Sequence, residues 1–215
     1  MKRKDRSLRM WFGVILVLTM MNTGCMSAFL TTAYLFGGDL TPAEFKDLKG
    51  KKVVVVCRPQ VPLPVGGRDA AQKLAKQVGM ILKRHVSKIK VVNHDKVADW
   101  MDNNSFEEYV DLGRAMEADV VLSIDLAEYD IHEGQTLLRG KAQYTVTVTD
   151  CRTTEELFTK TPDRAVWPPN TGVPTMSQNE NAFQRKFINV LADEISRSFY
   201  RHDGRSNFAD DVTAL

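Results

Sequence analysis

Three side chains that can bind a metal ion alternate along one short stretch of the sequence, at Glu128, Asp130 and His132. Residues two apart in a β-strand point to the same face, so this row would gather two carboxylates and an imidazole on one side of a sheet. Such groups bind zinc and other divalent ions, and a metal held there would make the protein a metal-dependent enzyme. The same residues also describe the solvated end of a strand before a turn at Glu133 and Gly134, and we favour that interpretation.

No other residues are spaced for catalysis. The sequence lacks the GxSxG, HExxH and phosphate-loop patterns. The pair Gly66 and Gly67 lacks the lysine and the glycine spacing of a phosphate loop, and His85, His94 and His202 have no partner at a useful spacing. We therefore expect no catalytic residues, no metal site and no cofactor.

A cysteine with a different chemistry ends the amino-terminal leader. Five basic residues occur before Met10, an apolar run continues to Met20, and the segment Met21-Asn22-Thr23-Gly24-Cys25 follows. This order is typical of a secretory signal, which we assign to residues 1–25. The cysteine directly after Thr-Gly resembles the lipobox of bacterial lipoproteins, with Asn22 at the position where that motif prefers leucine. The resemblance implies that Cys25 carries a diacylglycerol and becomes the new N-terminus.

A transmembrane anchor is the alternative to the lipid. No charged residue occurs between Arg9 and Asp39, and an uncharged run longer than about 18 residues can span a bilayer as a helix. Either anchor leaves the basic residues in the cytoplasm and carries everything after Asp39 across the membrane. We therefore expect a protein of the bacterial cell envelope, anchored by lipid to the outer membrane and facing the periplasm.

The charge balance argues against nucleic acid as a partner. The chain has 29 Lys+Arg and 27 Asp+Glu, and its positive net charge comes from the basic leader. No basic stripe with interleaved aromatic residues occurs. We expect contact with the membrane through the N-terminal anchor and with an envelope protein that the sequence does not identify.

After the leader, the sequence predicts a tether over residues 26–50, one α/β domain over residues 51–203, and a flexible tail over residues 204–215. A domain of this length is long enough to bury a substantial core.

The first half of the domain alternates strands and helices. The β-branched run Val53–Cys57 is typical of a strand covered on both faces, and residues 70–84 follow as an amphipathic helix. A short strand at residues 89–93 precedes two helical segments within residues 95–116, where Ser105 and Glu108 have the spacing of a capping box. A third strand is predicted at residues 120–126. Such an order favours crossover connections and parallel pairing.

The second half is antiparallel in character. Residues 133–135 form a turn, and residues 138–150 alternate apolar and polar side chains, as expected of a strand with one solvated face. A shorter strand is predicted at residues 156–159, and a long helix begins near residue 180. The order β-α-β-α-α-β-β-β-α predicts an α/β (α+β) fold. Its mixed sheet of about five strands is parallel in the first half, antiparallel in the second, and flanked by helices.

A loop connects the strand at residues 53–57 to the first helix. In open parallel sheets, binding clefts lie beyond the carboxyl ends of the strands, which is where this loop belongs. The candidate recognition residues are Arg58, Gln60, Gly66, Gly67 and Arg68. A loop without a binding role is the simpler interpretation, and a small-molecule or lipid site at the same place is a third possibility.

Two cysteines remain after Cys25, and in an oxidising compartment they would invite a disulfide. The predicted topology places Cys57 at the carboxyl edge of the sheet and Cys151 at the opposite edge, about 20 Å away for seven residues of strand. A disulfide requires Cα atoms within roughly 7 Å. We therefore predict two free thiols, with Cys57 packed as a small apolar residue and Cys151 at a strand end.

The order of elements resembles the TolB amino-terminal and CsgG-like fold of envelope lipoproteins that assemble or regulate other machines. Three stretches carry the resemblance: Val53–Val56 leading into an aliphatic helix, Ile89–Asn93, and Gly113–Leu122, which has the family's helix-to-strand pattern G-x-A-x-x-A-D-x-x-L. The likeness covers residues 51–203 and implies a non-enzymatic binding or assembly module. Pore-forming CsgG-like relatives carry long insertions for membrane hairpins, and the sequence has no such paired amphipathic segments.

Overall fold

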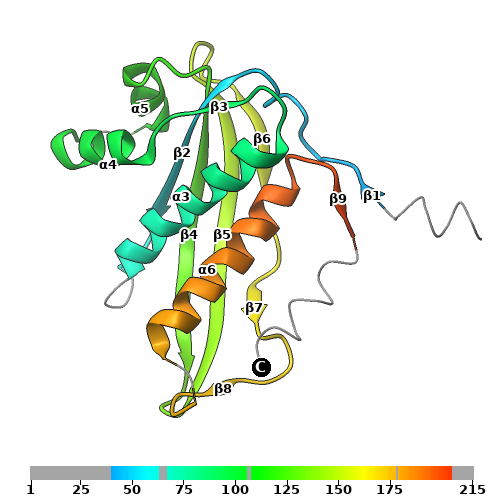
Figure 1. The fold of residues 1–215 in the computed structure, drawn as a ribbon. Coiled ribbons are helices and arrows are strands. Elements are labelled where there is room, and N and C mark those ends of the chain that lie inside the picture. Colours follow the sequence, from blue (N-terminus) through cyan, green and yellow to red (C-terminus); the bar gives the residue numbers. More distant parts are fainter. Residues whose placement is uncertain (1–39, 63–66, 106–107, 178, 205–215) are drawn as a thin grey trace, which may run out of the picture. The chain divides into compact units, whose positions relative to one another are not determined.

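The computed structural model describes residues 40–62, 67–105, 108–177 and 179–204. Apart from Leu40, the helices and strands belong to one compact unit that begins at Thr41. These elements follow the predicted order, with four short strands that were not predicted (Figure 1). The elements are β1 (Leu40–Thr41), β2 (Lys52–Pro59), α3 (Gly67–His85), β3 (Lys90–Val91), α4 (His94–Asn103), α5 (Tyr109–Ala115), β4 (Val120–Glu133), β5 (Leu137–Asp150), β6 (Glu156–Lys160), β7 (Ala165–Trp167), β8 (Val173–Pro174), α6 (Glu180–Arg197) and β9 (His202–Asp203). The four strands that were not predicted are β1, β7, β8 and β9.

One mixed sheet forms the centre of the domain, with strand order β3-β2-β4-β5-β6, and β7 and β8 pair with the remaining part of β5. Strand β2 runs parallel to β3 and to β4, whereas β5 runs antiparallel to β4 and to β6. The prediction of a parallel first half and an antiparallel second half is therefore confirmed. Strand β4 lies between β2 and β5 and is a central strand of the sheet.

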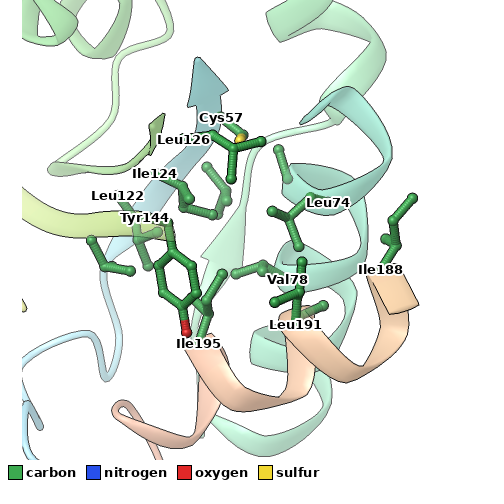
Figure 2. Packing of buried hydrophobic residues seen from close by; sticks show 14 of the residues in the cluster. Cys57, Leu74, Val78, Leu122, Ile124, Leu126, Tyr144, Ile188, Leu191 and Ile195 are labelled. Carbon is green, nitrogen blue, oxygen red and sulfur yellow. The ribbon is translucent and has the colours of Figure 1, made fainter. Parts of the chain in front are cut away.

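Helices α3 and α6 cover one face of the sheet (Figure 1). Leu122 and Ile124 of β4 point to this face, where they join Leu74 and Val78 of α3 and Leu191 of α6 (Figure 2). Each of these side chains is at most 1% exposed. Burial of one such aliphatic side chain contributes about 1.5–3 kcal/mol, so this layer supplies most of the apolar stabilisation of the domain.

Helices α4 and α5 pack on the opposite face, over the parallel part of the sheet. Val56 and Val121 point to this side and form a second cluster with Val97 of α4 and Leu112 of α5. Strand β2 is therefore covered on both faces, which explains why the run Val53–Cys57 is apolar at every position.

Gly113 is the point of closest approach between α5 and the sheet. A Cβ atom at this position would lie 2.4 Å from the Sγ of Cys151 and 2.5 Å from the Cγ2 of Val121. Only a residue without a side chain permits this contact. The helix-to-strand joint that begins at Gly113 is thus as tight as its sequence pattern suggests.

The second face of β5 is solvated, as its alternating sequence predicted. Its apolar residues are buried, while Thr145 and Thr147 are half-buried on the other side. The hydroxyl of Thr147 lies 3.2 Å from that of Thr159, and the hydroxyl of Thr145 lies 2.8 Å from that of Thr161. These threonines satisfy one another's hydrogen bonds across neighbouring strands.

The two cysteines of the domain are free, as predicted. Cys57 lies beside Ile124 in the sheet, and Cys151 follows Asp150, which lies beside Val120. The two thiols also belong to clusters on opposite faces of the sheet. Both residues are buried, with Cys57 packed as a small apolar residue and Cys151 at a strand end.

Some boundaries differ from the prediction. The capping box is wrong, because Glu108 is extended (φ −110°, ψ 139°) and α5 begins only at Tyr109. Strand β4 continues to Glu133, well past the predicted end. Within the segment assigned to the tether, Phe45 and Leu48 are buried in the core, and the Phe45 backbone N–H donates to the Ser198 carbonyl at 3.0 Å. The domain boundaries otherwise stay predictions, because residues 1–39 and 205–215 lie outside the described residues.

Candidate functional site

A pocket of about 690 Å³ lies at the carboxyl end of β2, between α3 and α4. Its floor is the end of β2 and the segment to Pro62, and its walls are the facing sides of the two helices. Helix α3 contributes the small apolar residues Ala71 and Ala75 to the lining. Helix α4 contributes Val97, Ala98 and Met101. The pocket therefore combines an apolar interior with a polar rim at the edge where the sequence predicted recognition.

The candidate recognition residues divide among three situations. Arg58 and Gln60 line the pocket and are exposed. Gly67 opens α3 and Arg68 follows it, and the structure describes the backbone but not the side chain of Arg68. Gly66 lies outside the described residues. The recognition role of these residues stays a prediction.

The carboxylate of Asp125 ties the pocket rim to α5. Its Oδ1 accepts a hydrogen bond from Gln60 Nε2 at 2.5 Å and a second one from the Tyr109 hydroxyl. Burial and the hydrogen bond to Asp125 raise the pKa of Tyr109, so this hydroxyl keeps its proton and acts as a donor. The contacts hold the start of the loop against β4 and α5.

His94 opens α4 and lines the pocket. The helix is capped by Asn93, whose Oδ1 accepts from the Asp95 backbone N–H at 2.9 Å. The Nδ1 of His94 is buried and has no hydrogen-bond partner among the described residues. Burial, and then the charge of Lys76, lower the pKa of His94, so its imidazole is neutral at neutral pH.

Cys57 also lines the pocket, but its thiol is not activated. Burial, and then the negative charge of Asp125, raise the pKa of Cys57. A reactive cysteine needs its thiolate, which an apolar and negatively charged environment disfavours. The thiol therefore acts as part of the apolar wall.

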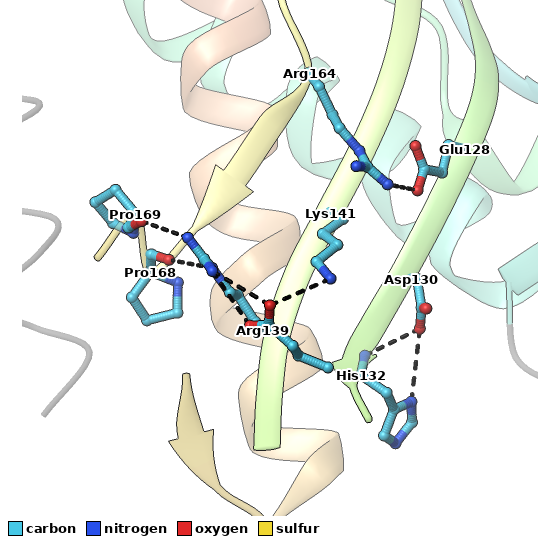
Figure 3. A network of polar contacts seen from close by, with 9 residues as sticks. Glu128, Asp130, His132, Arg139, Lys141, Arg164, Pro168 and Pro169 are labelled. Carbon is cyan, nitrogen blue, oxygen red and sulfur yellow. Dashed lines mark hydrogen bonds and ion pairs between the residues drawn. The ribbon is translucent and has the colours of Figure 1, made fainter. Parts of the chain in front are cut away.

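The row of Glu128, Asp130 and His132 lies in the distal part of β4 (Figure 3). Glu128 forms an ion pair with Arg164. His132 lies between two carboxylates, with its Nδ1 3.7 Å from Asp130 Oδ1 and its Nε2 3.3 Å from Glu180 Oε1. Two register shifts interrupt the pairing of β4 with β5 in this part, so the strict two-residue alternation assumed from the sequence does not apply.

Next to this row, the carboxylate of Glu133 is shared by two cations, Arg139 and Lys141. Arg139 Nη1 lies 3.3 Å from Glu133 Oε2, and Lys141 Nζ lies 3.7 Å from Oε1. Arg139 also donates to the Pro168 carbonyl at 3.2 Å and to the Pro169 carbonyl at 2.5 Å. The polar residues at this end of the hairpin thus connect strands to the segment after β7. In the part of the chain that the structure describes, no three His, Cys, Asp or Glu side chains come together as a metal site.

Sequence reasoning missed the contribution of α4 to the pocket. The sequence predicts a helical segment here, but nothing in it assigns Val97, Ala98 or Met101 to a site. Pro59 is the one residue whose type could have indicated an unpaired strand edge here, since proline inside a sheet is confined to edges. Among the described residues, no helix is long and apolar enough to cross a membrane.

Neither a protein-family model nor a curated protein matches the chain. Several solved structures are similar. PelC from Paraburkholderia phytofirmans, a dodecamer, is 13% identical with a TM-score of 0.46 over 75% of this chain and 95% of that chain. Lipoprotein GNA1162 from Neisseria meningitidis is 15% identical (TM-score 0.44, 68% and 98%), and a minor lipoprotein from Acinetobacter baumannii is 17% identical (TM-score 0.34, 69% and 91%). Two of these three are bacterial lipoproteins by description. Likeness at this level establishes neither a family nor a function, and the TolB amino-terminal and CsgG-like resemblance stays a prediction.

Proposed function

We propose that the chain is a membrane-tethered lipoprotein of the bacterial cell envelope that acts as a non-enzymatic binding or assembly module on the periplasmic side of the outer membrane. The observation that carries this proposal is the leader, in which a basic start and an apolar run end in Thr23-Gly24-Cys25 before a folded α/β domain. Cys25 lies outside the described residues, so the anchor rests on the sequence alone.

The chemistry of the described side chains supports binding over catalysis. Glu128 belongs to the only row with metal-ligand spacing in the sequence. Its carboxylate forms an ion pair with Arg164. His132 is placed between Asp130 and Glu180 as a member of a polar cluster. The pocket has no ionised nucleophile among its described residues, because the Cys57 thiol is neutral. These contacts are those of a structural surface.

Lipidation is tested by Cys25→Ala, with Cys57→Ala as the matched control. The wild type and the control should incorporate labelled fatty acid and fractionate with the outer membrane. Cys25→Ala should remain as a larger, unprocessed precursor without label. If the mature N-terminus and its mass are the same in Cys25→Ala as in the wild type, the lipid anchor is wrong.

The binding role is tested by crosslinking from native membranes. A wild-type chain should capture a defined envelope protein, and reversing the charge on the pocket rim with Arg58→Glu should reduce the capture more than the same change at Arg152, which lies in an exposed turn elsewhere. Metal analysis of the purified chain tests the enzymatic alternative. Stoichiometric zinc that disappears in His132→Ala would overturn the binding-module proposal.

A further inference from the structure

Strand β2 has a second edge that β3 covers only at its start. The backbone N–H groups of Lys90 and Val92 donate to the carbonyls of Lys51 and Val53, each at 2.9 Å. In the described part of the chain, the pairing of β3 with β2 ends at Val53. On the opposite edge, β2 stays paired with β4 as far as Pro59. The remainder of β2 therefore has one paired edge and one open edge.

The direction of the backbone groups along β2 shows which of them are unpaired. Residues of a strand point their N–H and C=O groups alternately to the two sides. The Lys52 carbonyl accepts from the backbone N–H of Asp119, just before β4, at 2.8 Å, and the Gln60 N–H donates to the Leu126 carbonyl of β4 at 3.0 Å. The backbone groups of even-numbered residues of β2 therefore point toward β4. Val55 and Cys57 consequently face the open edge with both groups, and these residues are only 4% and 6% exposed.

Backbone groups that are this deeply buried almost always have a hydrogen-bond partner, because an unpaired one loses its contact with water. Pro59 agrees with the assignment, since its nitrogen falls on the open side, where a strand tolerates proline. The open edge of β2 thus presents a short ladder of donors and acceptors that, within the described chain, lacks its second strand.

Space for that strand lies directly beside the edge. The pocket of about 690 Å³ borders β2 from Val56 onward, and a second pocket of about 300 Å³ borders it at Val55. The two pockets adjoin, because both are lined by Ala75 and His94. Helix α3 lines the smaller pocket with the small residues Ala75 and Gly79 and with the longer side chains of Lys76, Met80 and Lys83. The helices α3 and α4 flank the edge, so a single extended chain fits there, whereas the wide edge of another sheet does not.

The polar groups of the groove formed by these two pockets indicate what such a chain would carry. His94 supplies a buried Nδ1 without a partner among the described residues. The charged side chains that line the groove in the described part of the chain are Arg58, Lys76, Lys83 and Asp102. Lys76 lies 4.0 Å from the carboxylate of Asp95, which partly balances its charge. The carboxylates of Asp95, Asp102 and Asp125 accompany the three cations, and the apolar lining that includes Ala71, Ala75 and Ala98 favours a peptide with small apolar side chains.

We propose that an extended peptide segment of a partner protein, with small apolar side chains, binds in this groove by adding a strand to the open edge of β2. This inference rests on the proposed function as a binding module and names the kind of partner segment. Main-chain hydrogen bonds to Val55, Cys57 and Pro59 would supply affinity, and the two pockets would select alternate side chains. A compact small molecule would fill a pocket but would leave the repeating backbone groups unpaired.

The test uses the full-length chain in detergent and a displayed library of linear peptides as the probe. Peptides that bind the wild type should lose affinity roughly tenfold or more for Ala98→Trp, which fills the groove. They should keep their affinity for the matched control Ala127→Trp, whose alanine is exposed on β4. Methylation of single peptide nitrogens should weaken binding at every second residue, the signature of an added strand.

Three results would overturn the inference: a library that yields no binder, binders that are indifferent to Ala98→Trp, or N-methylation effects without a period of two. The crosslinking experiment separates these results from the proposed function. If Ala98→Trp still captures the same envelope protein as the wild type, the binding module stands and the groove is not its recognition site.

Discussion

Replacing Gly113 by alanine would place a methyl group at the contact between α5 and the sheet. The added Cβ would lie 2.4 Å from the Sγ of Cys151 and 2.5 Å from the Cγ2 of Val121. Both distances are about 1 Å short of the normal separation of such atoms. Val121 is fully buried and Cys151 is nearly so, which leaves neither side chain free to move away. Helix α5 must therefore shift outward, or the second cluster must repack.

The expected loss of stability follows from two opposing terms. Overpacking of a well-filled core costs about 1–3 kcal/mol. Alanine is favoured over glycine in a helix by up to about 1 kcal/mol, and less near the end of a helix such as α5. We expect Gly113→Ala to lower the free energy of unfolding by about 1–2 kcal/mol. For a domain of this size that corresponds to a fall in Tm of roughly 2–8 °C.

Thermal and denaturant unfolding of the full-length chain, followed by circular dichroism, would measure the change. Gly79→Ala in α3 is the matched control, because its Cβ would lie 3.2 Å from Val91 Cγ1 and 3.9 Å from Val55 Cγ2, a much milder contact, and should alter stability by less than about 1 kcal/mol. Adding Cys151→Ala to Gly113→Ala removes one of the clashing atoms, so the two changes should cost less together than their sum. If Gly113→Ala is as stable as the wild type, or the two changes add within about 0.5 kcal/mol, the described contact does not restrict α5.

Other predictions address the central strand, the thiols and the response to acid. Val121→Asp would bury an unpaired carboxylate in a central strand and cost several kcal/mol of a typical total of about 5–15, so a soluble variant that still melts cooperatively would contradict the assignment. Alkylation of the denatured, unreduced domain should label both of its thiols, whereas a mass two daltons low without label would refute the strand order. Hydrogen bonds from the backbone N–H of Thr153, at 3.0 Å, and of Arg152, at 2.9 Å, lower the pKa of Asp150. Because the folded-state pKa lies below the ordinary value, this stabilisation is present above about pH 4 and disappears as the pH falls through the folded-state pKa. Since this carboxylate is exposed and screened by water, Asp150→Asn should be less stable than the wild type by at most about 0.5 kcal/mol at neutral pH, and a difference that persists in strong acid would assign it to something other than the charge.

The sheet was predictable where one physical pattern dominates. A continuous apolar run at Val53–Cys57 required cover on both faces, and α3 and α4 provide it. The alternation over residues 138–150 required one wet face, and the paired threonines form it. Burial of one or both faces leaves a strict period in the sequence, so these strands and their pairing could be read from it.

The rest depends on contacts between distant residues. The register shifts in β4 near Leu126 and Asp130 leave no mark in the alternation of side chains. The sequence therefore predicted that Glu128, Asp130 and His132 lie on one face of a regular strand, which the shifts interrupt. The capping residues at the start of α5 had the right identities, but Glu108 is extended, and local preference did not decide the boundary. The open edge of β2 arises because β3 stops after Val91, and a strand's length relative to its neighbour is not a local property.

Because the two cysteines lie on opposite faces of the sheet, a disulfide between them can form only before the domain folds. Once the sheet has formed, it stands between Cys57 and Cys151, and no side-chain motion can join them. A chain that meets an oxidant before β2 and β5 take their places can cross-link, and the resulting bond is incompatible with the native order of strands. Molecules that fold before they are oxidised stay reduced inside. Those that are oxidised first cannot reach the native fold, so the yield of native protein under oxidising conditions depends on the relative rates of strand pairing and thiol oxidation.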